Sequence, residues 1–198
     1  MRTRLAVALA ATLALGTAVP SQGAMRPLNQ VVDPKGDAKA NLGFADILTG
    51  RWTTQGTGTS RALVATLTLA GAPRTDPGFG YELSAQVDGC GLVQFAYRPF
   101  SVTGTSLGPK SFYIGCGAPD DIYGTMSLYD EVTLTIGGRT ITWSVPLAAL
   151  PREVNVGATY REFGAVADVA EPLTGSPVGL LPGASVDTGY GAAVWKLR

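Results

Sequence analysis

The amino-acid sequence predicts an all-β fold, an antiparallel β-sandwich of about eight or nine strands without a long helix. Three observations lead to this prediction. Only 15% of the residues are charged, and glycine and proline are abundant, with 26 and 13 copies. The apolar residues come in short alternating runs that end at these glycines and prolines, which is typical of short strands joined by tight turns. A closed β-barrel is the main alternative.

The first clearly predicted strands lie between residues 62 and 97. Residues 62–69 alternate apolar side chains with small or polar ones, the period-2 pattern of a half-buried strand. Residues 81–87 and 92–97 show the same alternation. Asp88 and Gly89 separate these two runs, and an Asp-Gly pair in that position predicts a β-hairpin.

A second hairpin is predicted around Gly137 and Gly138, which separate the alternating runs 132–136 and 139–145. Both central residues of a type I′ turn need positive φ, which glycine adopts without steric cost, so we expect a type I′ turn here. Prolines on both sides of residues 147–150 then permit only a single helical turn, which predicts a corner.

The C-terminal part of the chain is predicted to hold two closing strands, at residues 160–169 and 192–197. Residues 171–191 lie between them and are rich in glycine and proline. This composition predicts a long surface loop.

The first 24 residues are predicted to be a cleavable secretion signal. Arg2 and Arg4 form a basic start, and residues 5–15 follow without a charge. This apolar core is about a dozen residues long, whereas a membrane span needs roughly 20. No later stretch is apolar enough to span a membrane. The sequence therefore predicts a secreted product with one domain at residues 25–198.

The composition excludes several classes of chemistry. The chain has no histidine, which rules out mechanisms and metal sites that depend on this side chain. It has 15 basic and 15 acidic residues without a basic cluster, so we expect no nucleic-acid partner. Neither Asp120-Asp121 nor Asp130-Glu131 can form a glycosidase pair alone, because neighbours in a strand point to opposite faces. The protein is not expected to be an enzyme.

Cys90 and Cys116 are the only cysteines of the chain. An even pair in a secreted protein favours a disulfide, and glycines on both sides of each cysteine allow the backbone to bend toward the bond. Closing this loop would stabilise the fold by about 3 kcal/mol. Two buried free thiols are the alternative.

Aspartates gather near the predicted mature N-terminus, in Asp33-Pro34-Lys35-Gly36-Asp37 and in Asp46-Ile47. Calcium takes six to eight oxygen ligands, and carboxylates separated by a glycine turn can supply several of them. The alternative is ordinary turn chemistry, in which each aspartate accepts hydrogen bonds from its own backbone.

The same motifs resemble the opening of secreted bacterial sandwich domains related to the DOMON and family-9 carbohydrate-binding groups. The resemblance extends to the hairpin and Val-Pro-Leu corner at residues 132–150. It implies a jelly-roll-like sandwich and a structural calcium at Asp33, Asp37 and Asp46, with Asp187 as a further ligand in the loop before the last strand. Some DOMON relatives bind haem through methionine and histidine, and the missing histidine makes haem unexpected here.

Aromatic and polar side chains suggest a ligand rim. Trp52, Trp143 and Trp195 lie within predicted strands and are expected to pack in the core. A rim is instead predicted at Tyr113, Asp120, Asp121 and Tyr123.

These observations favour a secreted, non-catalytic binding module. We expect it to be stabilised by calcium and to recognise carbohydrate or another component of the cell envelope. The alternative is a secreted structural or protein-interaction domain that has no small-molecule ligand.

Overall fold

The computed structural model describes residues 30–38, 42–76, 78–98, 110–116, 125–128, 130–169, 171–172, 180–181 and 185–198. Within these ranges the regular structure is β-strand, apart from three-residue 3-10 turns at Gly58–Ser60, Leu147–Ala149 and Arg152–Val154. This confirms the all-β prediction, and the turn at Leu147–Ala149 confirms the predicted corner.

The smaller sheet has five strands in the order β1-β2-β3-β9-β8. All of its pairings are antiparallel. Its strands are β1 (Val31–Val32), β2 (Ile47–Gln55), β3 (Ala62–Leu69), β8 (Thr133–Gly137) and β9 (Thr140–Pro146).

The larger sheet has seven strands, six of them in the order β13-β10-β4-β5-β6-β7, while β14 pairs with β10. These pairings are also antiparallel. The strands are β4 (Phe79–Val87), β5 (Gly91–Tyr97), β6 (Lys110–Gly115), β7 (Thr125–Leu128), β10 (Thr159–Val169), β13 (Ser185–Gly191) and β14 (Trp195–Lys196). A separate two-stranded ribbon joins β11 (Glu171–Pro172) to β12 (Leu180–Leu181).

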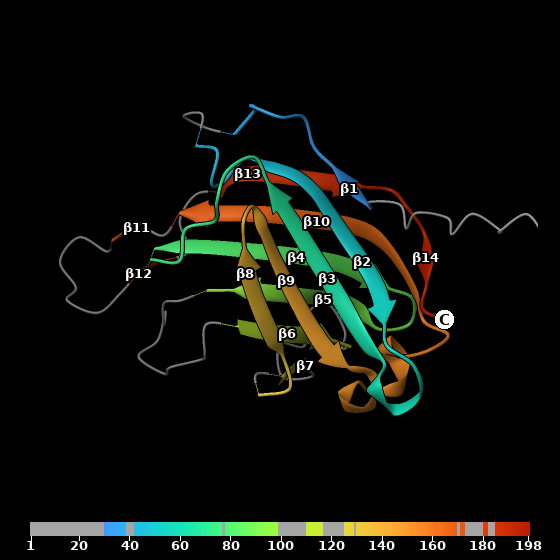
Figure 1. Ribbon diagram of the computed structural model, residues 1–198. Coiled ribbons are helices and arrows are strands. Elements are labelled where there is room, and N and C mark those ends of the chain that lie inside the picture. Colours follow the sequence, from blue (N-terminus) through green and yellow to red (C-terminus); the bar gives the residue numbers. More distant parts are fainter. Residues whose placement is uncertain are drawn as a thin grey trace, which may run out of the picture.

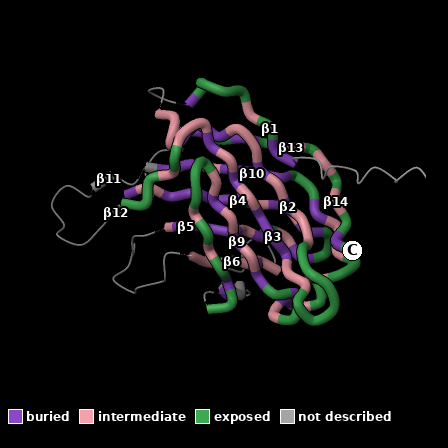
Figure 2. The backbone as a smooth tube through the Cα atoms, in the orientation of Figure 1, coloured by how far each residue is buried: buried purple, intermediate pink, exposed green. Residues whose placement is uncertain are grey.

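The two sheets form the two layers of a sandwich, with the smaller sheet crossing obliquely over the larger one (Figure 1). Buried and partly exposed residues alternate along most strands (Figure 2). Trp52 of β2 is completely buried, and its ring lies 5.2 Å from that of Phe95 and 5.8 Å from that of Tyr160 in the opposite sheet. Contacts of this kind hold the layers together by burying apolar surface from both sheets.

The sheets contain more strands than the eight or nine expected. The additional strands include β1, which has two residues. Two residues are too few to display an alternating pattern, so the sequence does not reveal β1. The predicted closing strand at residues 192–197 is present as β14, which is shorter than expected, at two residues. The presence of two separate hydrogen-bonded sheets also favours the sandwich over a closed barrel.

Both predicted hairpins form, with turns that differ from the expectation. Val87 pairs with Gly91, so the first turn has three residues rather than the Asp-Gly pair alone. In the second hairpin Gly137 pairs with Thr140, and the central residues are Gly138 and Arg139. Of these two only Gly138 has positive φ, at 59°, which fits a type II′ turn. The predicted type I′ turn centred on Gly137 and Gly138 is therefore wrong by one residue.

Cys90 and Cys116 form a disulfide between the turn after β4 and the end of β6. Gly91 has a φ of 132°, and a Cβ at this residue would lie 2.5 Å from the carbonyl oxygen of Gly115. Glycine is therefore needed for the two backbones to approach beside the disulfide.

The predicted loop at residues 171–191 is wrong in its last part, because Ser185–Gly191 is strand β13. Its glycines permit close packing rather than a turn. A Cβ on Gly189 would lie 2.7 Å from Cγ1 of Val31, and one on Gly191 would overlap the carbonyl of Gln30. Strand β13 thus packs closely against the segment that contains β1.

Gln30 extends the edge of the smaller sheet with its side chain. Its backbone N–H donates to the carbonyl of Gly50 at 3.0 Å. Its side-chain amide donates to the carbonyl of Trp52 at 3.0 Å and accepts from the N–H of Trp52 at 2.8 Å. The side chain therefore makes the two bonds that a neighbouring strand would make.

The predicted signal peptide at residues 1–24 lies outside the described residues. In the part of the chain that the structure does describe, no helix has the length and apolar character needed to cross a membrane.

Candidate metal centre

The segment that follows β1 folds into a turn that is held by Asp46. The N–H of Asp33 donates to the carbonyl of Leu48 at 3.1 Å, which keeps the start of the turn beside β2. Gly36 has a φ of 90°, a conformation that favours glycine. Its N–H donates to both carboxylate oxygens of Asp46, at 2.9 and 3.1 Å. The buried Asp46 carboxylate therefore fixes the turn between Asp33 and Asp37.

Asp187 connects the two sheets at the same end of the sandwich. It lies in β13 of the larger sheet and is buried. One carboxylate oxygen accepts the N–H of Ile47, in β2 of the smaller sheet, at 2.6 Å. The other accepts the N–H of Thr188 at 2.9 Å. The side chain thus has a fixed position, although the sequence suggested that Asp187 lies in a loop.

Three of the four predicted metal ligands converge. Asp33, Asp37 and Asp187 each present a carboxylate oxygen, and these oxygens all lie within 4.8 Å of one another. Asp46 lies close enough to act electrostatically on Asp33 and Asp187, but it does not belong to the group of converging oxygens, and its carboxylate accepts the N–H of Gly36. The geometry therefore gives Asp46 a positioning role beside a group of three potential ligands.

Burial and charge repulsion within this group raise the pKa values of Asp33 and Asp187. Burial, and then the negative charges of Asp187, Asp37 and Asp46, raise the pKa of Asp33 to about 6. Burial also raises the pKa of Asp187, and the charges of Asp37 and Asp46 act in the same direction, while N–H donors from Ile47 and Thr188 oppose it. A side-chain hydrogen bond with Asp187 also raises the pKa of Asp33, so the fully ionised group is unfavourable until a cation or a proton compensates its charge.

Asp33 provides independent evidence of an incomplete site. Its Oδ2 atom is buried and has no hydrogen-bond partner. A buried carboxylate oxygen without a partner is energetically costly, and such atoms in folded proteins need an explanation. A bound cation is one such explanation.

The donor set matches the chemistry of calcium. Two ligands on opposite sides of a calcium ion, each about 2.4 Å from it, lie about 4.8 Å apart. The three carboxylate oxygens lie within that distance of one another. Carboxylate oxygens are hard ligands suited to calcium, and Asp37 is exposed, so water can complete the coordination.

The predicted ligand rim is described only at Tyr113. This residue is partly exposed in β6, where it lies between Gln94 of β5 and Ser127 of β7. The other three rim residues, Asp120, Asp121 and Tyr123, lie outside the described residues.

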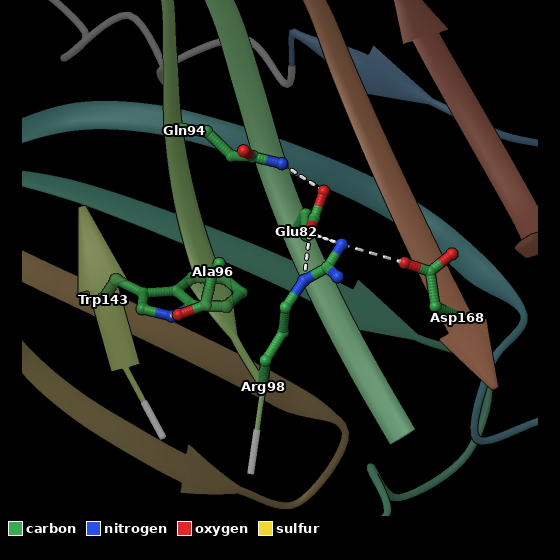
Figure 3. Close-up of polar contacts among 6 residues, drawn as sticks. All are labelled: Glu82, Gln94, Ala96, Arg98, Trp143 and Asp168. Carbon is green, nitrogen blue, oxygen red and sulfur yellow. Dashed lines mark hydrogen bonds and ion pairs between the residues drawn. The ribbon is translucent and has the colours of Figure 1, made fainter. Parts of the chain in front are cut away.

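A second polar cluster, which the sequence did not indicate, lies on β4, β5 and β10 (Figure 3). The guanidinium of Arg98 forms ion pairs with Glu82 and, at 3.2 Å, with Asp168. The side-chain amide of Gln94 donates to the other oxygen of Glu82. Both carboxylate residues are 7% exposed. We call these four residues the Arg98 cluster.

The Arg98 cluster satisfies its carboxylates internally. Burial raises the pKa of Glu82, and the positive charge and hydrogen bond of Arg98 oppose this shift. Beside the cluster, the indole N–H of Trp143 in the opposite sheet donates to the carbonyl of Ala96 at 3.1 Å. These contacts connect three strands of the larger sheet and fix it to the smaller one, so the arrangement is suited to stabilising the fold.

A comparison with known protein families finds no model that matches the chain, and a comparison with curated proteins finds no match. The resemblance to DOMON and family-9 carbohydrate-binding domains therefore stays a prediction.

Proposed function

We propose that this protein is an exported, non-catalytic binding module that is stabilised by calcium and recognises carbohydrate or another component of the cell envelope. The convergence of Asp33, Asp37 and Asp187 around the unpartnered Oδ2 of Asp33 carries the calcium part of this proposal. Export is supported by the signal-like N-terminus and by the Cys90–Cys116 disulfide, because disulfides persist in oxidising compartments.

Calcium bound here would have a structural role. Asp33 follows β1 of the smaller sheet, whereas Asp187 belongs to β13 of the larger one. A shared ion would join the two layers at one edge and remove the repulsion among the carboxylates.

A binding role is favoured over catalysis by the chemistry of the available side chains. The chain lacks histidine, so a serine or cysteine nucleophile has no imidazole to activate it. Glu82 and Asp168 are buried carboxylates, but both contact Arg98. The charges of both carboxylates are thus engaged in ion pairs within the fold.

The calcium proposal can be tested by thermal melting in a chelator and in millimolar calcium. At a free concentration about 100 times Kd, calcium would stabilise the fold by about 2.7 kcal/mol and raise the melting temperature. Asp37→Ala should abolish this increase, since it removes an exposed ligand. Asp130→Ala makes the same change at an exposed residue outside the cluster and should leave the response intact. An identical melting curve with and without calcium contradicts the proposal.

The binding part requires a separate test. Binding of the calcium-loaded protein to an array of neutral and acidic glycans would support a carbohydrate-binding module. No binding to any glycan would contradict it and favour the alternative of a protein-interaction domain.

A further inference from the structure

A cleft lies where β14 approaches β2, at an edge of the sandwich. Its volume is about 460 Å³, within the range of roughly 300 to 1,000 Å³ that is usual for ligand pockets. The residues that line it come from β2 and the C-terminal segment: Thr53, Thr54, Val194, Trp195, Lys196 and Arg198.

The position of the cleft follows from the incomplete pairing of β2. Strand β1 pairs with β2 only at Thr49 and Gly50, and the Gln30 side chain continues the contact to Trp52. Thr53 and Thr54 lie beyond this cover. The cleft therefore begins at the point along β2 where β1 and the Gln30 side chain no longer cover the strand edge that faces away from β3.

Two basic residues lie on the same side of the C-terminal segment. Lys196 and Arg198 flank the fully buried Leu197, so strand alternation places both basic side chains opposite the core. The N–H and carbonyl of Leu197 bond to the backbone of Ala158 and Gly157 at 2.9 and 2.8 Å. Neither cation forms an ion pair within the part of the chain that the structure describes.

The other lining residues suit a sugar ring. The ring of Trp195 is held against that of Tyr160, with 5.2 Å between centroids, and it lines the cleft. Val194 is 69% exposed beside it. Thr53 and Thr54 supply hydroxyl groups that can exchange hydrogen bonds with sugar hydroxyls. The cleft is thus lined by an aromatic residue, two threonines and two basic residues, a combination that suits a ring with hydroxyl groups and a negative charge.

We infer that this cleft binds an acidic saccharide, with its carboxylate near Lys196 and Arg198 and its ring near Trp195. This inference rests on the binding part of the proposed function and names the ligand class and the site. None of the described lining side chains is acidic. The chain as a whole has equal numbers of basic and acidic residues, so the positive charge is a local property.

The test is calorimetric titration of the calcium-loaded protein with a galacturonic acid trimer and with its methyl ester, at one fixed free calcium concentration. The ester retains the rings and removes the charge. The site variant is Lys196→Gln/Arg198→Gln. The matched control is Arg139→Gln/Arg152→Gln, which removes the same charge from exposed residues elsewhere.

We expect the wild type and the control to bind the acid, and the site variant to lose roughly tenfold or more in affinity, because charge-assisted hydrogen bonds are lost. The ester should bind the wild type with a similarly reduced affinity. Trp52 and Trp143 are fully buried, so a ligand-induced change in tryptophan fluorescence should come from Trp195 and disappear in Trp195→Phe.

Several results would overturn the inference. If the site variant binds the acid as tightly as the wild type, the cleft is not the binding site. If both double variants lose the same affinity for the acid, the binding reflects only general electrostatic attraction. If the protein binds polyphosphate and not the trimer, the ligand is not an acidic saccharide. Binding of neutral glycans alone overturns this inference and leaves the binding module standing, whereas binding of no glycan overturns both.

Discussion

The Asp33, Asp37 and Asp187 carboxylates lie together, and no described cationic side chain forms an ion pair with them. Glu82 and Asp168, in contrast, share the guanidinium of Arg98. Both groups concentrate negative charge in the same sandwich, at buried or partly buried positions except for the exposed Asp37. In the Arg98 cluster the compensating cation is part of the chain, and in the aspartate group it would have to come from solution.

This comparison predicts different responses to substitution. The Arg98 cluster should contribute a fixed stability that is insensitive to calcium. The aspartate group should oppose folding at neutral pH until a cation or a proton neutralises it.

The largest expected effect is that of Arg98→Met. It leaves Glu82 and Asp168 without their shared cation, and breaking a buried ion pair in this way typically lowers stability by about 3–5 kcal/mol. The measurement is chemical denaturation at pH 7, with and without calcium. The loss of stability should be the same with and without calcium. Recovery of the lost stability in calcium would contradict the independence of the Arg98 cluster from the aspartate group.

The next effect is the pH dependence of the metal-free protein. The folded-state pKa of Asp33 is raised from 3.8 to about 6, so its protonated form favours folding. The stability gained from protonation of Asp33 is fully present below the pKa of 3.8 in the unfolded chain, and it is lost as the pH rises through about 6. One pKa unit corresponds to about 1.36 kcal/mol, and water screens this partly exposed carboxyl group, so the loss of stability should be well below the roughly 3 kcal/mol of an unscreened shift.

Asp33→Asn isolates this pH effect from the titration of Glu82, whose pKa is also raised. Relative to this variant, the metal-free wild type should be less stable at about pH 7.5 and should recover as the pH falls to about 4. Parallel stability curves for the two proteins would show that Asp33 does not titrate as described.

Calcium affinity should fall in acid, because calcium and protons compete for the same carboxylates. With the pKa of Asp33 at about 6, the apparent affinity should decrease about tenfold between about pH 7.5 and pH 5. Titration of the metal-free protein with calcium at several pH values measures this change. Constant affinity over that interval would exclude Asp33 as a ligand.

The smallest effect concerns the exposed ion pair between Arg161 and Asp88. Arg161→Ala should lower stability by less than about 1 kcal/mol, because water screens an exposed pair and side-chain entropy opposes it. Denaturation alongside Arg98→Met provides the comparison. An equal loss in the two variants would show that burial does not distinguish the Arg98 cluster.

The sequence predicts the fold well where the signal is local. The alternation around Asp88-Gly89 and Gly137-Gly138 is contained within a few residues, so both hairpins could be predicted. Strand β13 could not, because glycine inside a strand resembles a loop in sequence. In the structure, the missing side chain of Gly189 leaves space for Val31, which is distant in the sequence.

The same distinction applies to the candidate site. Asp33 and Asp37 are neighbours in the sequence, whereas their approach to Asp187 depends on the packing of β1 against β13. The Arg98 cluster gives no local signal at all. Alternation assigns Glu82 to the outer face of its strand, where a carboxylate is usually exposed, and only cross-strand geometry brings Arg98 to it.

The side chain of Gln30 has a consequence for how molecules of this protein behave beside one another. An open strand edge is a template for pairing with another chain, and the N–H and carbonyl of Trp52 are covered here by one amide side chain. Rotation of that side chain would uncover both groups without unfolding either sheet. A single glutamine side chain thus occupies two backbone groups that a strand of a neighbouring molecule could otherwise bond.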